Sequence, residues 1–166
     1  RWATHGKPSK INAHPHMDNS NTFSVVHNGI IENYAELKSE LIKNGYKFLS
    51  ETDTEIIPNL IHFCFSKDEK TDDLKFLRAV KNACSQLKGS YAIEVISSLY
   101  PDRMIVVRKD SPLVIGKGDT ENYISSDIPA ILSFTKDFYL LNDNEFAVLY
   151  KTSAKFYDTD LNEINK

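Results

Sequence analysis

The second half of the chain restricts the fold most, because residues 90–157 form a succession of short β-prone runs. Turn residues such as Tyr100-Pro101-Asp102 and Asn142-Asp143-Asn144 separate these runs. Two sheets packed between helices would bury the apolar faces of such strands. The predicted strands are 90–98, 103–109, 113–117, 122–125, 138–141, 146–151 and 155–157.

The first half shows the apolar spacing of three helices. A capping box of Asn33 and Glu36 predicts a first helix that ends at Gly45, and a second box of Thr52 and Glu55 predicts the next. Strands are expected at 23–27 and 46–49, and a long loop over 1–22. The apolar stripes are Leu37, Leu41 and Ile42, then Ile56, Leu60, Ile61 and Cys64, then Leu74, Leu77, Val80, Cys84 and Leu87 before a stop at Gly89.

Composition is that of an ordinary globular protein of one domain, with 166 residues of which 41% are hydrophobic and 26% charged. The formal net charge of -3 gives no general attraction to nucleic acid or anionic membranes. No apolar run approaches the roughly 20 residues that cross a bilayer. Cys64 and Cys84 lack C-x-x-C spacing and lie on apolar stripes, which indicates core packing in a reducing compartment. We therefore expect a cytoplasmic protein that binds neither nucleic acid nor membrane.

The candidate site lies where the apolar strand that begins at Phe23 ends in Asn28-Gly29. A side-chain amide and an adjacent backbone N–H can both point at one developing negative oxygen, as acyl transfer from an amide requires. The same dipeptide is also the commonest hairpin turn, so the pair alone leaves a turn open. Polar residues at 1–6 and 50–55 would complete a pocket for a small zwitterion, with no nucleophile beside it.

Five motifs follow one another along the chain in an order that resembles the glutaminase domains of glutamine amidotransferases with an N-terminal nucleophile. They are Arg1-Trp2-Ala3-Thr4-His5-Gly6, Asn12-Ala13-His14-Pro15-His16, His27-Asn28-Gly29-Ile30-Ile31-Glu32-Asn33, Ser50-Glu51-Thr52-Asp53-Thr54-Glu55 and Ser111-Pro112-Leu113-Val114-Ile115-Gly116. The first two motifs favour the hexosamine-forming branch. By this resemblance residues 1–166 are a partial glutaminase domain. The implied fold is α+β, a four-layer α-β-β-α sandwich that lacks its first strands.

The resemblance also implies how L-glutamine is bound. Arg1 would grip the α-carboxylate with its guanidinium fork, assisted by Thr4 and His5. Trp2 would lie on the loop that closes over the site, and Asp53 would bind the α-ammonium. Taken alone, Arg1 could instead form a surface ion pair, Trp2 could anchor a core, and Asp53 could be a carboxylate at a helix N-terminus.

By the same resemblance, Asn28 and the Gly29 N–H form the oxyanion hole. His14, His16 and His27 do not have the spacing of a tetrahedral metal site, so we expect no metal and no cofactor. His14 is interpreted as a positional or inter-domain residue. The Gly116-Lys117-Gly118 stretch lacks the spacing of a phosphate loop and is expected to be a turn.

The sequence departs from the family at its front, because these enzymes begin with a cysteine nucleophile, whereas residue 1 here is an arginine and we expect several dozen family residues before it to be missing. We expect the chain alone to be inactive, and to self-associate through uncovered sheet edges. The complete protein would be a homodimer with a sugar isomerase domain, passing ammonia from glutamine to fructose-6-phosphate. The alternatives are a non-catalytic glutamine-binding or assembly fragment, and the glutaminase domain of another amidotransferase of this class.

Overall fold

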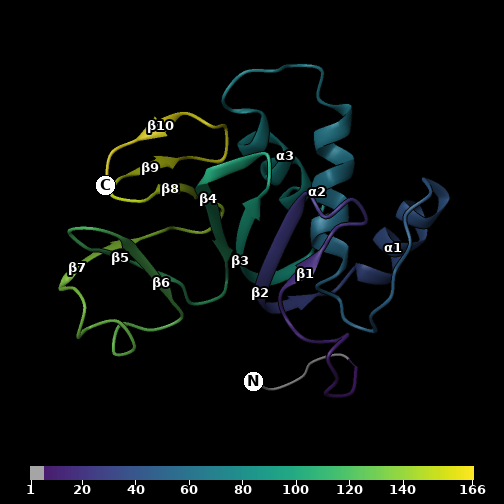
Figure 1. Cartoon of the computed structure of the whole chain (residues 1–166), viewed down its shortest axis with the longest axis horizontal. Helices are drawn as coiled ribbons and strands as arrows, with labels where there is room; N and C mark the ends of the chain where they lie inside the picture. Colours follow the sequence, from purple (N-terminus) through teal and green to yellow (C-terminus); the bar gives the residue numbers. More distant parts are fainter. Residues whose placement is uncertain (1–5) are drawn as a thin grey trace.

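The computed structural model describes residues 6–166, which form three helices and two antiparallel sheets. Figure 1 shows the helices on one side of the larger sheet and the smaller sheet beside its other face. No helix within the described residues is long and apolar enough to span a membrane. The elements are β1 (His16–Met17), β2 (Phe23–Ile31), α1 (Tyr34–Lys43), α2 (Ile56–Lys67), α3 (Lys75–Cys84), β3 (Gly89–Ser97), β4 (Tyr100–Lys109), β5 (Val114–Lys117), β6 (Asn122–Ser125), β7 (Asp137–Leu140), β8 (Phe146–Tyr150), β9 (Ala154–Tyr157) and β10 (Glu163–Ile164).

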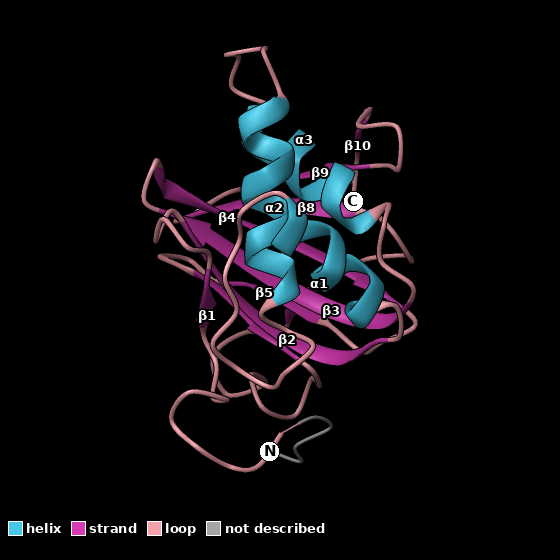
Figure 2. Ribbon diagram, turned by 90° about the vertical axis from the view of Figure 1, so that its right-hand side faces the viewer, coloured by secondary structure: helices cyan, strands magenta, loops and turns pink. Residues whose placement is uncertain are grey.

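The larger sheet has the strand order β1-β2-β3-β4-β8-β9-β10, and the smaller sheet has the order β6-β5-β7. In Figure 2 the three helices cover the near face of the larger sheet. The resulting layers are helices, large sheet and small sheet. These are three of the four layers of an α-β-β-α sandwich, which confirms the two stacked sheets expected from the strand pattern.

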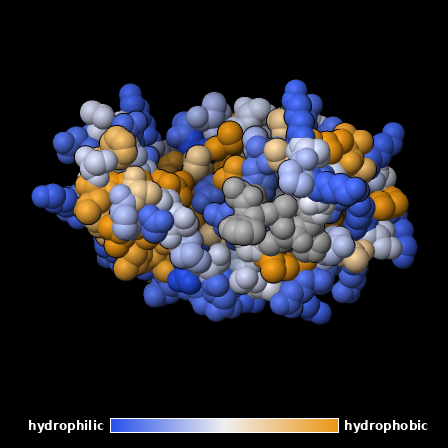
Figure 3. Space-filling model, turned by 90° about the horizontal axis from the view of Figure 1, so that it is seen from below, coloured by the Kyte–Doolittle hydropathy of each residue, from blue (hydrophilic) through white to orange (hydrophobic). Residues whose placement is uncertain are grey.

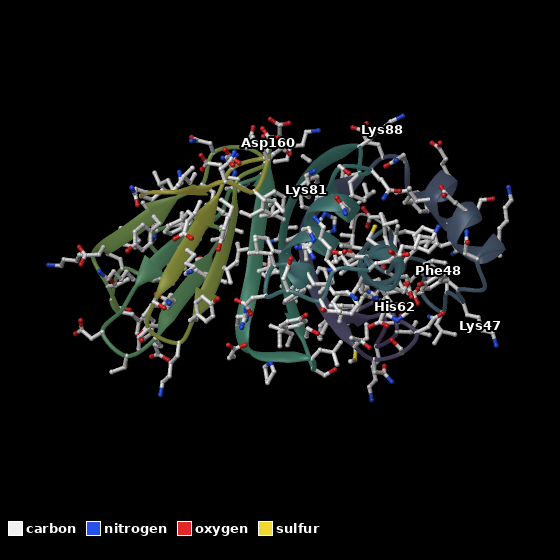
Figure 4. The ribbon with its side chains drawn as sticks, turned by 90° about the horizontal axis from the view of Figure 1, so that it is seen from above. Lys47, Phe48, His62, Lys81, Lys88 and Asp160 are labelled. Atoms are coloured by element: carbon white, nitrogen blue, oxygen red, sulfur yellow. The ribbon has the colours of Figure 1, made fainter. Side chains whose placement is uncertain are left out.

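The main core lies between the helices and the larger sheet, because alternate residues of the strands point to that face. From β2 the buried residues on this face include Phe23, Val25 and Ile31. The ring of Phe23 packs against Phe65 of α2 and Phe76 of α3, with centroids 5.3 and 5.5 Å apart. Phe48 and His62, labelled in Figure 4, lie on the helical side of the molecule, where Tyr46 Oη and His62 Nδ1 form a 2.7 Å hydrogen bond.

A second core fills the space between the two sheets. It is built from Ala92 and Val106 of the larger sheet and Ile115 of the smaller one, among others. On the outer face of β5, a Cβ added to Gly116 would lie 2.7 Å from Thr135 Cγ2 and 3.0 Å from Ile131 Cδ1, so these two side chains pack closely on this glycine. Around residues 128–135 Figure 3 shows hydrophobic surface, to which Leu132, Phe134 and Leu140 contribute.

The capping boxes predicted for the first two helices are wrong, because tertiary contacts take the side chains that would form them. Asn33 donates from Nδ2 to Gln86 O and accepts from Lys88 N, so it ties the start of α1 to the segment before β3. The carboxylate of Glu55 accepts from the backbone N–H groups of Leu49 and Ser50. Neither helix has a side-chain cap.

Several predicted boundaries also differ. Residues 46–49 form no strand, because Lys47 exchanges its backbone hydrogen bonds with the side chain of Asn19. The loop over 1–22 contains β1, and Ile42 is 53% exposed instead of facing the core. The third helix ends at Cys84, and Gly89 begins β3 with φ +113°. Tyr100-Pro101-Asp102 belongs to β4 instead of a turn.

Glu94 of β3 is a carboxyl group on an apolar part of the larger sheet, between Val26 and Val106 in the strand register. Burial raises the pKa of Glu94 to about 7. The stability that the neutral carboxyl group of Glu94 contributes is therefore fully present below the unfolded pKa of about 4.3, and it is lost as the pH rises through about 7.

We expect Glu94→Gln to flatten the fall in unfolding free energy between about pH 5 and pH 8, measured by urea denaturation. The exposed Glu69→Gln is the control, and an unchanged slope in Glu94→Gln would contradict the prediction.

Candidate functional site

Asn28 and Gly29 lie inside strand β2, so the alternative of a hairpin turn is wrong. In the register Asn28 opposes Ala92 and Gly29 opposes Tyr91. Asn28 is exposed, and its neighbour His27 is buried on the helical side of the sheet. Gly29 has φ +130°, and a Cβ at this position would lie 2.1 Å from Ser90 O. Only glycine therefore fits here, and an exposed amide side chain stands next to a backbone that no side chain shields.

Asp53 lies beside the same end of β2. It is 2% exposed, and its Oδ2 accepts a 2.8 Å hydrogen bond from the backbone N–H of Ile31. Asp53 lies three residues before the first residue of α2, so its position also fits the alternative of a carboxylate at a helix N-terminus, although α2 has no side-chain cap. The predicted ammonium-binding carboxylate thus contacts β2 at Ile31, which lies two residues after Gly29 on the strand.

Hydroxyl and imidazole groups surround Asp53 on both sides in sequence. Thr54 Oγ1 lies 3.0 Å from His27 Nδ1 and 3.2 Å from His14 Nε2. Thr52 Oγ1 lies 3.1 Å from His16 Nε2 and 3.0 Å from Ser50 Oγ. The segment that carries Asp53 is therefore attached to both β1 and β2 through side chains.

Arg1, Trp2, Thr4 and His5 lie outside the described residues. The segment that follows them is held against the Asp53 segment by Asn12, which donates from Nδ2 to Lys7 O at 2.9 Å and accepts from Glu51 N at 3.0 Å. Gly6 packs on the same side chain with φ +74°. The chain that leaves residues 1–5 thus contacts the segment two residues before Asp53.

Sequence reasoning gave no role to Arg108 or Ser111, although Ser111 opens one of the five motifs. Arg108 Nε donates to Ser111 O at 2.6 Å, and its Nη2 pairs with Asp143 at 2.8 Å. Ser111 Oγ approaches the backbone carbonyl of Asn28 at 3.5 Å. The loop between β4 and β5, which carries Ser111, therefore contacts β2 at Asn28.

Neither cysteine has the properties of a nucleophile. Burial raises the pKa of Cys64 to about 11 and that of Cys84 to about 12. Both thiols are therefore overwhelmingly protonated at neutral pH. Because the thiolate is the reactive form, neither is a good nucleophile. Among residues 6–166, no three His, Cys, Asp or Glu side chains gather to hold a metal ion.

We expect iodoacetamide to modify native Cys64 and Cys84 far more slowly than a thiol of pKa about 8.5 at pH 7.5. The rate at half-buried Cys64 should rise as the pH approaches about 11, while buried Cys84 stays protected. Peptide mass spectrometry measures both rates, and the unfolded protein in urea is the control. Rapid native alkylation of Cys84 would contradict the structure.

Residues 5–133 match the family model described as a glutamine amidotransferase domain, and the chain therefore belongs to the glutamine amidotransferase domain family. Over all of its residues it is 52% identical to the glutamine–fructose-6-phosphate aminotransferase [isomerizing] of Clostridium tetani and 50% identical to that of Clostridium perfringens. The chain covers 26% of each of these relatives. The Bacillus subtilis glutamine phosphoribosylpyrophosphate amidotransferase, solved with ADP and GMP, matches 98% of this chain and 34% of its own with a TM-score of 0.75. At 24% identity this likeness shows the fold alone.

Proposed function

We propose that residues 1–166 act as the glutaminase domain of a longer glutamine–fructose-6-phosphate aminotransferase. The domain would hydrolyse L-glutamine and supply ammonia for the conversion of fructose-6-phosphate to glucosamine-6-phosphate. One observation carries this proposal: the Asp53 carboxylate is bonded to Ile31 on the strand that presents Asn28 and Gly29. The identity with the clostridial enzymes over the whole chain supports the choice of acceptor sugar.

In this proposal a thiolate attacks the side-chain amide carbon of glutamine, and the carbonyl electron pair moves to oxygen. The Asn28 amide and the Gly29 N–H donate hydrogen bonds to that oxyanion. The general base that took the proton of the thiol returns it to the leaving nitrogen, so collapse of the intermediate expels ammonia, and water then hydrolyses the thioester to glutamate and restores the thiol. By the resemblance to amidotransferases with an N-terminal nucleophile, we assign the thiol to an N-terminal cysteine of the longer protein. The raised pKa values of Cys64 and Cys84 agree with this assignment.

The two ends of glutamine would be held by groups of opposite charge. The buried carboxylate of Asp53 would bind the α-ammonium. Its hydrogen bond to Ile31 of β2 would fix its distance from the oxyanion residues on the same strand. Arg1 is assigned to the α-carboxylate, with Thr4 and His5 beside it and Trp2 on the loop over the substrate. A sugar isomerase domain of the same protein would receive the ammonia, and we assign the complete enzyme as a homodimer.

The test is product analysis with the full-length protein that contains this domain. L-Glutamine alone should give glutamate, and L-glutamine with fructose-6-phosphate should give glutamate and glucosamine-6-phosphate in equal amounts. Glutamate without any amino sugar would reassign the acceptor and keep the glutaminase. Binding of glutamine without hydrolysis would replace the proposal with a non-catalytic glutamine-binding role.

A further inference from the structure

Thr54 joins three segments of the site through one hydroxyl group. Its side chain is 1% exposed, and its Oγ1 lies within hydrogen-bond distance of His27 on β2 and of His14 in the loop before β1. A hydroxyl has one proton to donate and lone pairs to accept. With both rings neutral, it can donate to one imidazole nitrogen and accept from the N–H of the other. The contact therefore fixes the orientation of both rings at once.

The position of this contact along β2 gives it a specific consequence. Thr54 follows Asp53 directly, and His27 precedes Asn28 directly. The two segments are thus joined at two points, through Thr54 to His27 at 3.0 Å and through Asp53 to the Ile31 N–H at 2.8 Å. The oxyanion pair lies between the two attachment points on the strand. A rigid frame of this kind sets the distance between the carboxylate of Asp53 and the donors at Asn28 and Gly29.

The other threonine of the segment has a different place. Thr52 is half-buried and bonds to His16 and Ser50, so it connects the segment to β1 and to the turn before it. Among residues 6–166, the hydroxyl partners of Thr52 are His16 and Ser50, and neither belongs to β2. Thr52 and Thr54 are therefore a matched pair: both hydroxyls bond to a histidine, and only the bond of Thr54 reaches the strand with the oxyanion residues.

We propose that Thr54 is a positioning residue for glutamine hydrolysis, which holds the ammonium-binding carboxylate of Asp53 in register with the oxyanion donors of β2. This assignment rests on the proposed function. Asp53 would bind the substrate in the ground state and in the transition state, whereas the oxyanion donors act in the transition state. A change in the distance between them therefore lowers kcat more than it raises KM. Misplacement by about 1 Å is enough to lower a rate about 10²-fold.

The experiment measures kcat and KM for glutamine hydrolysis by the full-length protein with Thr54→Val, Thr54→Ser and Thr52→Val. Valine keeps the shape of threonine and removes the hydroxyl, whereas serine keeps the hydroxyl. We expect Thr54→Val to lower kcat by about tenfold or more with a smaller change in KM. The kcat of Thr54→Ser should be within about threefold of that of the unaltered protein, and the kcat of Thr52→Val should lie in the same range.

Three results would overturn the assignment: an unchanged kcat in Thr54→Val, equal losses in Thr54→Val and Thr52→Val, or no recovery in Thr54→Ser. If Thr54→Val does not fold, His27, the partner of Thr54 on β2, provides a second pair of variants. His27→Asn retains a polar group that can reach Thr54, and His27→Leu does not, so kcat should fall far more in the leucine variant. No hydrolysis by the unaltered protein would overturn the proposed function itself, whereas hydrolysis with normal Thr54→Val kinetics would overturn this assignment alone.

Discussion

Replacing Asn28 with alanine is expected to lower kcat for glutamine hydrolysis by the full-length protein about 10²–10³-fold, equivalent to about 2.7–4 kcal/mol of transition-state stabilisation. The reason is geometric. Strand pairing fixes the backbone of Asn28 before the substrate arrives, and the glycine beside it carries no side chain that would shield the neighbouring N–H. In the proposed function, the group that Asn28 stabilises is an oxyanion that exists only during the reaction. KM should therefore change much less than kcat.

A glutamate-release assay at saturating and subsaturating glutamine measures both parameters. Asn82→Ala, at an exposed position on α3 on the helical side of the molecule, is the control and should leave both unchanged. If Asn28→Ala kept the full kcat and raised only KM, Asn28 would be a ground-state binding residue. The oxyanion role would then have to be given up, while the fold and family would stand.

Periodicity predicted the elements well where the side chains only pack in the apolar core. The main core confirms the packing of the strand from Phe23 and of the stripe from Leu77 to Leu87. Leu74, the first residue predicted for this stripe, is exposed. Local rules failed where a distant group competed for the same atoms. Asn33 fits a capping box but bonds to Gln86 and Lys88, more than 50 residues away. A residue can satisfy only one such geometry, and the sequence alone does not say which.

The candidate site shows the same division. Asn28, Gly29 and Asp53 could be named because their motifs resemble those of the amidotransferases. Taken singly, the amide beside a glycine also fitted a turn, and the carboxylate also fitted a helix N-terminus. The contacts of Thr54 with His14 and His27 join residues that are 40 and 27 positions apart. No local spacing predicts them, since they depend on the antiparallel pairing of β1 with β2 and on the approach of α2 to both strands. The supporting network around the reactive groups therefore had to come from the structure.

Gly29→Ala is expected to lower the unfolding free energy of the domain by about 4 kcal/mol or more, among the largest effects of a single substitution. The added Cβ would lie 2.1 Å from Ser90 O, far inside the roughly 3.5 Å optimum for non-bonded heavy atoms. Ser90 and Gly29 belong to strands that stay in register from Phe23 opposite Ser97 to Ile31 opposite Gly89. Relief of the overlap would require β2 and β3 to separate in the middle of the larger sheet.

Gly45→Ala separates this steric effect from backbone strain. Gly45 also has a positive φ, +90°, but an added Cβ would meet nothing within 4 Å. Its alanine variant should cost only the strain of a left-handed residue, about 1–2 kcal/mol. Hydrogen exchange of the β2 and β3 amides in the full-length protein measures both variants. Equal protection in the two would mean that β2 and β3 are not as tightly paired at Gly29 as the structure shows, whereas selective loss in Gly29→Ala would show that this pairing depends on the absence of a side chain at Gly29.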